Sequence, residues 1–270
     1  KRWRKRYSEA ELAQLAAALL TQPEFTFRAE RGFEPGELAA EAVPAFGEFR
    51  FFRACSAARL LESAALRDGR IYIQDPATTL AASLPGMEPV RRILDVCAAP
   101  GGKSIHLAEK LRGTGHVEAR DVSEQKVALI DENIKRCRLT NITAKCQDAT
   151  VLDEASVRTA DVLIADLPCS GLGVLRRKTD IKYRMNPEGE ESLVALQRQI
   201  LSVVCKYVKP GGTLIYSTCT IHTAENEGNA RWFEQTHPEF ALDTMRQMFP
   251  EEHLGDGFFI AKFKRKQDNG

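Results

Sequence analysis

The chain has 270 residues, of which 43% are hydrophobic, and its formal net charge is +1. This length suits one large domain, or one domain with a smaller appendage, and the composition supplies a proper core. No apolar run approaches the roughly 18 residues of a membrane span, and no secretory signal precedes the first predicted helix. We therefore expect no membrane partner.

The cysteine content excludes two further classes of protein. Seven cysteines without a Cys-x-x-Cys pair argue against a disulfide framework and against a tetrahedral zinc site. We expect no bound metal. Reduced thiols are typical of the cytoplasm, which is the location that we expect.

Positive charge is clustered although the net charge is small. Five of the first six residues are basic, and smaller clusters occur at 91–92 and at 262–266. The run Arg176-Arg177-Lys178 would flank the cleft described below, where a phosphate backbone could be held. The chain begins at Lys1 rather than at Met, and we expect that an upstream segment was removed.

The N-terminal region predicts a small α+β unit. Leucines at helical spacing predict a helix over 8–20, and Ser8 with Glu11 forms a capping box at its start. Four phenylalanines follow close together; a small hydrophobic core is their expected use, with base stacking as the alternative: Phe46, Phe49, Phe51 and Phe52.

From residue 71 onward, strands alternate with helices. The apolar runs predict strands at 93–97, 116–122, 142–147, 160–165, 213–216 and 258–263, with helices between them. Strands that alternate with helices imply a parallel sheet that is covered on both faces. The predicted fold class is therefore α/β, with a smaller N-terminal region.

The loop after the first of these strands indicates a cofactor. It does not match G-x-G-x-x-G, which disfavours a dinucleotide, but glycines at a helix N-terminus still let the backbone approach a ligand. Its residues are Cys97, Ala98, Ala99, Pro100, Gly101, Gly102 and Lys103.

Carboxylates follow the next three strands. Asp121 can take the two ribose hydroxyls of a nucleoside, Asp148 can accept from an adenine amino group, and Asp166 ends the fourth strand. Three acids without a phosphate motif suit a nucleoside that carries positive charge. S-adenosylmethionine is such a ligand, and it is the cofactor that we expect.

Two thiols lie at the ends of predicted strands. Cys169 stands in Asp166-Leu167-Pro168-Cys169, and Cys219 stands in Ser217-Thr218-Cys219. Ligands and reacting groups gather at the carboxyl ends of strands in an open α/β sheet. Both thiols should therefore point into one cleft beside Asp166, an arrangement suited to nucleophilic attack.

These motifs resemble those of the Nop2/Sun (Fmu) family of RNA cytosine-C5 methyltransferases. The resemblance is carried by segments 94–103, 166–171 and 217–219, with further matches at 73–76 and 255–259. It is strong over about 70–264 and weak over 1–69. Among its branches the chain looks most like the bacterial small-subunit rRNA methyltransferase B group.

The resemblance implies an S-adenosylmethionine-dependent, Rossmann-like methyltransferase domain over 71–270 and an RNA-guiding region over 1–70. It implies that Cys219 attacks carbon 6 of a cytosine, that Asp166 binds the N3/N4 edge of the base, and that Cys169 assists breakdown of the adduct. Lys103 would contact the cofactor or Asp166. The implied partner is RNA, most simply small-subunit rRNA. The remaining cysteines should be core or surface residues: Cys55, Cys137, Cys146 and Cys205.

The sequence departs from the family pattern at three places. Leu167 stands where many members have alanine, and Arg28-Ala29-Glu30 replaces an arginine-x-asparagine, which puts phosphate binding by that segment in doubt. An upstream helical RNA-binding domain, common in the rRNA branch, is not part of this sequence.

Other functions remain open at this point. A tRNA cytosine-C5 methyltransferase would use the same residues, whereas a DNA enzyme would attack with Cys169 and would not need Cys219. A non-catalytic ribosome-assembly factor could keep a vestigial cofactor site. A nicotinamide-dependent oxidoreductase is the weakest alternative, because its phosphate motif is missing.

Overall fold

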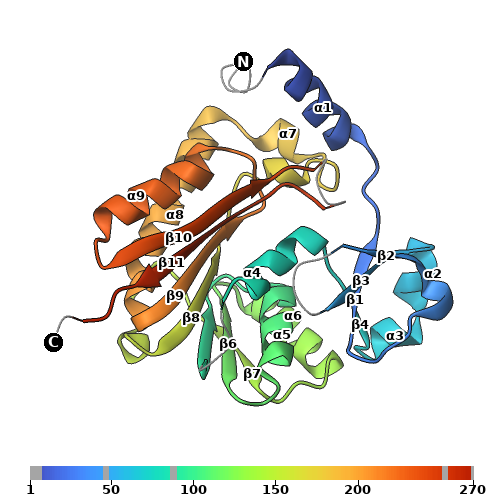
Figure 1. Cartoon of the computed structure of the whole chain (residues 1–270), viewed down its shortest axis with the longest axis horizontal. Helices are drawn as coiled ribbons and strands as arrows, with labels where there is room; N and C mark the ends of the chain where they lie inside the picture. Colours follow the sequence, from blue (N-terminus) through green and yellow to red (C-terminus); the bar gives the residue numbers. More distant parts are fainter. Residues whose placement is uncertain (1–7, 45–48, 86–89, 251–254, 269–270) are drawn as a thin grey trace.

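A computed structural model describes residues 8–44, 49–85, 90–250 and 255–268. It contains a seven-stranded sheet and a four-stranded sheet, and Figure 1 shows the smaller one beside the larger α/β unit. No helix in these described ranges is long and apolar enough to cross a membrane.

The large sheet has the strand order β10-β11-β9-β8-β5-β6-β7. The five strands from β5 to β9 pair in parallel, as the sequence predicts. The bounds are β5 Arg92–Asp95, β6 His116–Asp121, β7 Ile142–Cys146, β8 Ala160–Asp166, β9 Val208–Thr218, β10 Phe240–Met248 and β11 Phe258–Arg265.

The expectation of a wholly parallel sheet is wrong at one edge. Strand β11 inserts between β9 and β10 and runs antiparallel to both. Strand β10 was not predicted, because most of its side chains are exposed or half-buried at the sheet edge and its sequence has no apolar run. The expected Rossmann-like α/β class is confirmed.

Helices cover both faces of the large sheet. On one face α4, α5 and α6 bury residues such as Leu80, Ile105 and Ile130 against the strands. On the other face α8 and α9 bury Ile200 and Phe233. Their bounds are α4 Thr79–Ser83, α5 Gly102–Leu111, α6 Glu124–Arg136, α8 Pro187–Val204 and α9 Asn229–Thr236, with a short α7 at Ile181–Arg184.

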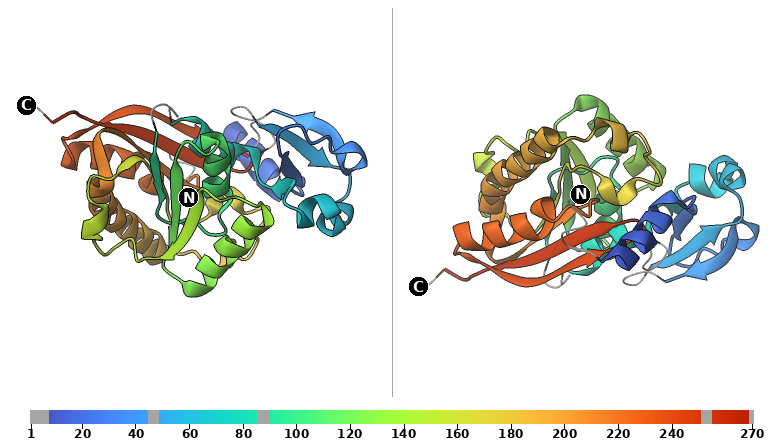
Figure 2. Two further views of the ribbon diagram at one scale, coloured as in Figure 1. Left: turned by 90° about the horizontal axis from the view of Figure 1, so that it is seen from below. Right: turned by 90° about the horizontal axis from the view of Figure 1, so that it is seen from above.

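The N-terminal sheet has the antiparallel order β2-β3-β1-β4 and lies to one side of the larger unit in both views of Figure 2. It packs against two short helices around a core that includes Phe27, Phe52, Leu60 and Ile71. The bounds are β1 Thr26–Ala29, β2 Ala39–Val43, β3 Arg50–Ala54, β4 Ile71–Ile73, α2 Ala57–Glu62 and α3 Ala64–Arg67.

The phenylalanine cluster serves this region's packing. Phe51 and Phe52 are buried, and the ring of Phe49 meets that of His106 edge-on with centroids 4.4 Å apart. Phe46 lies outside the described residues. The division of the chain at residue 70 stays a prediction. Strand β4, which follows that position, pairs with β1 of the small sheet.

The first helix, α1 (Glu9–Leu20), has the predicted capping box between Ser8 and Glu11. Its Leu15 and Leu19 pack against Ile221, close to where the site described below is built. Figure 1 shows α1 beside α7 at the top of the view, away from the C-terminus. The N-terminal helix therefore reaches across to the carboxyl end of the large sheet.

A buried ion pair joins the small sheet to α5. Arg28 is 2% exposed, pairs with Glu109 and also donates to Gln74 Oε1 at 3.2 Å. Glu30 pairs with Arg70 instead, at 2.6 Å. Arg28 is thus committed to protein contacts.

Replacing Glu109 by glutamine should destabilise the fold. The change leaves the Arg28 guanidinium buried without its counter-charge, which costs about 3 kcal/mol when a buried pair loses one partner. Urea unfolding followed by circular dichroism measures the loss, with the exposed Glu62→Gln as the control. A free energy of unfolding equal to that of the control would contradict the importance of this pair.

Candidate active site

The site is built where β8 and β9 end side by side. The two strands pair in parallel, with Asp166 opposite Ser217 in the register. The loop after β8 carries Cys169, and the residue after β9 is Cys219. Their sulfur atoms lie 3.3 Å apart, and both side chains are partly buried. The prediction that both thiols meet in one place is confirmed.

Asp166 is fixed by two neighbours. Its Oδ2 contacts Lys103 Nζ at 2.5 Å, and its Oδ1 accepts a hydrogen bond from Ser217 Oγ at 2.7 Å. Burial works to lower the pKa of Lys103, but the carboxylate of Asp166 outweighs it and holds that pKa above its ordinary value. The protonated Lys103 ammonium group therefore lies close to the thiols.

The pKa values of the two thiols are shifted in opposite directions. The hydrogen bond with Cys169 lowers the pKa of Cys219, whereas burial and the charge of Asp166 raise it. The charges of Lys103 and Lys178 lower it further. The same contact, together with burial, raises the pKa of Cys169 well above its ordinary value. Cys219 is thus the thiol that ionises first.

A cavity of about 600 Å³ opens beside the sulfurs, within the usual size range of small-molecule sites. Its lining includes seven of the residues predicted for catalysis or cofactor binding, namely Cys97, Ala99, Asp121, Asp148, Asp166, Cys169 and Cys219. The predicted loop residues Ala98, Pro100, Gly101, Gly102 and Lys103 do not belong to the lining.

The loop between β5 and α5 is held against the end of β6. Asp121 Oδ2 accepts from Ala99 N at 3.2 Å, and its Oδ1 accepts from Val122 N at 2.9 Å. Gly101 has φ of 102°, which favours glycine, and lets the chain turn into the helix. Asp148 accepts from the backbone and hydroxyl of Thr150 at 2.8 and 2.7 Å.

Asp95 also lies here, at the end of β5, although sequence reasoning gave it no role. It is fully buried, its Oδ2 accepts from Ser104 Oγ at 2.6 Å, and burial raises its pKa to about 6. Its Oδ1 has no hydrogen-bond partner in the described part of the chain. Its contact with Ser104 holds the first turn of α5 against the end of β5.

The expectation that the run Arg176-Arg177-Lys178 holds phosphate needs a correction. Both arginines form ion pairs with Asp256, Arg176 at 2.6 Å, and Arg177 also reaches Asp75 at 3.3 Å. Because buried carboxylates attract these guanidinium groups, the arginines join the chain segments at 75 and 256. Lys178, the third cation of the run, works to lower the pKa of Cys219.

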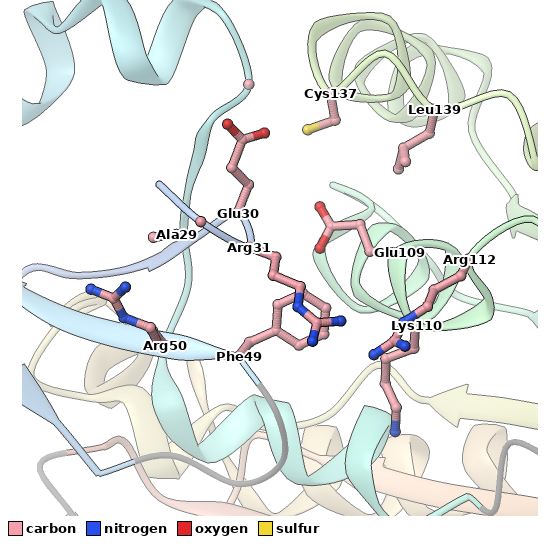
Figure 3. Close-up of a pocket in the computed structure, with 12 residues that line it drawn as sticks. Ala29, Glu30, Arg31, Phe49, Arg50, Glu109, Lys110, Arg112, Cys137 and Leu139 are labelled. Atoms are coloured by element: carbon pink, nitrogen blue, oxygen red, sulfur yellow. The ribbon is translucent and has the colours of Figure 1, made fainter. Parts of the chain in front are cut away.

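A second cavity, of about 640 Å³, lies between the small sheet and α5. Figure 3 shows Arg31 and Phe49 on one side of it and Glu109, Lys110 and Arg112 on the other. None of the predicted catalytic or cofactor residues lines it. Among the described residues no group of three or more His, Cys, Asp and Glu side chains could hold a metal ion.

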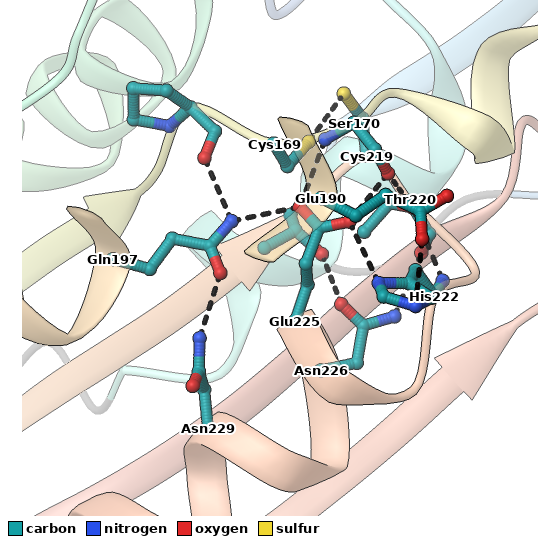
Figure 4. A network of polar contacts seen from close by, with 12 residues as sticks. Cys169, Ser170, Glu190, Gln197, Cys219, Thr220, His222, Glu225, Asn226 and Asn229 are labelled. Carbon is teal, nitrogen blue, oxygen red and sulfur yellow. Dashed lines mark hydrogen bonds and ion pairs between the residues drawn. The ribbon is translucent and has the colours of Figure 1, made fainter. Parts of the chain in front are cut away.

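Sequence reasoning missed a buried polar network behind the thiols. Figure 4 shows Glu225 at its centre, with Ser170, Gln197 and His222 around it. The segment was expected to be a plain helix, whereas Ala224–Gly228 forms a π-helix before α9. The one available signal was the acidic Glu225 six residues after Cys219, which the pattern alone could not place in the interior.

A family comparison agrees with this geometry. Residues 84–264 match the family described as 16S rRNA methyltransferase RsmB/F. The chain belongs to this family. The probable ribosomal RNA small subunit methyltransferase B of Bacillus subtilis (strain 168) is 38% identical over 74% of the chain. The ribosomal RNA small subunit methyltransferase F of Escherichia coli O139:H28 is 30% identical over the same share.

The chain spans about half the length of these curated relatives, 49% and 46% respectively. Among solved structures, the crystal structure of PH0851 has a TM-score of 0.85 and 27% identity, and covers 95% of this chain and 63% of its own. The crystal structure of NSun6 from Pyrococcus horikoshii with SFG has a TM-score of 0.68 and 30% identity, and covers 77% and 56%. The family resemblance read from the motifs is thus confirmed.

Removing the Cys169 thiol should make Cys219 less acidic. Cys169→Ala deletes the hydrogen bond that favours the Cys219 thiolate, so the pKa of Cys219 should rise. Alkylation by iodoacetamide, followed at Cys219 by peptide mass spectrometry across a pH series, should then need a higher pH. The exposed Cys55 serves as the internal control. An unchanged or lower midpoint for Cys219 would refute the effect that we assign to this hydrogen bond.

Proposed function

We propose that the protein transfers a methyl group from S-adenosylmethionine to carbon 5 of a cytosine in RNA. The observation that carries this proposal is the contact between the Cys169 and Cys219 thiols. Their sulfur atoms lie 3.3 Å apart beside the Asp166–Lys103 ion pair, and their pKa values are shifted in opposite directions. The family, and the names of relatives that are rRNA methyltransferases, support the same reaction class.

Cytosine needs a nucleophile before its carbon 5 can react. A thiolate that adds to carbon 6 moves electron density onto carbon 5, which then attacks a methyl donor. An ordinary thiol is only a few per cent ionised at neutral pH. Cys219 has the lowered pKa and the adjacent cations, so it is the residue that we assign to this attack.

Asp166 is placed to bind the base while charge develops on it. Its carboxylate lies between Lys103 and Ser217 and lines the cavity with both thiols. A carboxylate there can accept a hydrogen bond from the N4 amino group of a cytosine, and from N3 once that nitrogen carries a proton. Lys103 and Ser217 hold the Asp166 carboxylate in its orientation.

Cys169 is assigned to the breakdown of the adduct. In that step the proton on carbon 5 must leave, its electron pair forms the C5–C6 double bond, and the bond from carbon 6 to the Cys219 sulfur breaks. Cys169 can give its proton to the departing sulfur and take the proton from carbon 5. It then ends the step as a thiol, as it began, and the high pKa of Cys169 favours this state.

The residues around the cavity fit S-adenosylmethionine. The carboxylates of Asp121 and Asp148 follow successive strands, where ribose hydroxyls and an adenine amino group can be bound. When bound, this cofactor supplies the electrophilic methyl group. SFG, named with the NSun6 structure, is an S-adenosylmethionine analogue, which supports the same choice.

Small-subunit rRNA is the substrate that the relatives' names favour over tRNA. The target base must leave its stack to reach the thiols, so a single-stranded or loop region is the expected context. The N-terminal unit is proposed to guide this RNA. A scaffold without catalysis is disfavoured, because the activated thiol and its partners are intact.

Cys169→Ser and Cys219→Ser should block the reaction at different steps. With small-subunit rRNA and labelled S-adenosylmethionine, Cys169→Ser should accumulate a covalent protein–RNA band on a denaturing gel, because the adduct forms but does not resolve. Cys219→Ser should give neither band nor methylation. If Cys219→Ser still methylates, Cys169 is the nucleophile, as in the DNA enzymes.

Asp121→Ala should weaken cofactor binding. Loss of a carboxylate that binds ribose hydroxyls removes charge-assisted hydrogen bonds worth about 1.5–3 kcal/mol, so the Kd should rise roughly tenfold or more. Isothermal titration calorimetry with S-adenosylmethionine measures this, with Asp68→Ala on the N-terminal unit as the control. Equal Kd values would place the ribose elsewhere.

A further inference from the structure

Glu225 is a buried carboxylate that binds the Cys169 loop. It is fully buried, and it accepts hydrogen bonds from Ser170 N at 2.9 Å and from Ser170 Oγ at 2.5 Å. Ser170 directly follows Cys169. The carboxylate therefore fixes both the backbone and the side chain of the residue next to the thiol.

The same network holds the other side of Cys169 and reaches the Cys219 loop. Gln197 Nε2 donates to Pro168 O at 2.8 Å and to Glu225 Oε2 at 2.9 Å. Ser170 Oγ lies 2.8 Å from Thr220 Oγ1, next to Cys219. Residues on both sides of Cys169, and one neighbour of Cys219, thus belong to one hydrogen-bonded unit.

Different charged groups act on the two thiols, and Glu225 is one of them. Burial works to raise the pKa of Glu225, but the nearby His222 ring and hydrogen bonds from Ser170 and Gln197 outweigh it and hold this pKa below its ordinary value. His222 Nδ1 lies 3.2 Å from Glu225, and its Nε2 lies 3.6 Å from Glu190. The negative charge of Glu225 acts on Cys169, whereas Lys103 and Lys178 act on Cys219.

We propose that Glu225 is a positioning residue that holds Cys169 protonated and in contact with Cys219, and so assigns attack to one thiol and adduct breakdown to the other. The proposal rests on the function proposed above. Without the carboxylate, the Cys169 loop loses its anchor, and the negative charge that favours the protonated Cys169 is gone. Cys219 loses part of the support of its hydrogen bond with Cys169 but keeps that of Lys103 and Lys178, so the attack is slowed and not abolished.

The test compares Glu225→Gln with Cys169→Ser in the covalent-band assay. Glu225→Gln keeps the side-chain volume but removes the charge and one acceptor for Ser170. It should accumulate the protein–RNA adduct as Cys169→Ser does, and its kcat should fall about tenfold or more with the KM for RNA unchanged. Glu191→Gln, on the exposed side of α8, is the matched control and should behave like the parent.

Glu225→Asp separates positioning from packing. Aspartate keeps the charge but is smaller, so its kcat should lie closer to the parent's than that of Glu225→Gln. If the residue only filled space, glutamine would be the better substitute and the order would reverse. That reversal, or a folded Glu225→Gln that methylates like the parent or loses adduct and methylation together, would overturn the proposal.

Ser170→Ala is the second variant, should Glu225→Gln not fold. It removes one of the two contacts between Glu225 and the Cys169 loop and the bridge to Thr220, and should accumulate a weaker adduct band. A Ser170→Ala protein without any adduct band would also overturn the proposal. If Cys169→Ser itself gives no band, the proposed function has failed, and the role of Glu225 fails with it.

Discussion

The parallel pairing of β8 with β9 is the constraint on which the site depends. Because Asp166 lies opposite Ser217 in this register, the loops that follow the two strands leave the sheet at the same edge. Cys169 and Cys219, fifty residues apart in the chain, are thereby brought into contact. A shift of one residue in either strand would turn its side chains to the other face and separate the groups.

Burial makes this contact chemically useful. Two thiols in water would ionise independently, whereas here they share a hydrogen bond in a partly enclosed place where neighbouring charges act strongly. Lys103 and Lys178 act on Cys219 together with the carboxylate of Asp166, whereas the carboxylate of Glu225 acts on Cys169. The difference in acidity between two identical side chains therefore comes first from the hydrogen bond between them, and then from the burial and the charges around each one.

The surrounding structure supports the site from three directions. Strand β11 pairs with β9 and brings Asp256 to Arg176 and Arg177, which ties the segment after Cys169 to the sheet. Helix α1 packs on Ile221, just beyond Cys219. Helix α8 contributes Gln197 to the network behind the thiols. Arg176 and Arg177, which the sequence suggested as a phosphate site, form ion pairs within the protein.

The sequence by itself determined the order of the parallel strands' apolar runs, the cofactor loop and the two thiol motifs, because each is a local pattern of a few consecutive residues. It could not determine the antiparallel edge, since β10 has no apolar pattern. Nor could it determine the hydrogen-bond partners of Arg28, Arg176 and Arg177, which lie 46 or more positions away in the chain. Only the tertiary structure decided that Glu225 is buried beside Cys169 and which thiol is the more acidic. Burial and charge arise from residues that meet through folding, and no short stretch of the chain contains them.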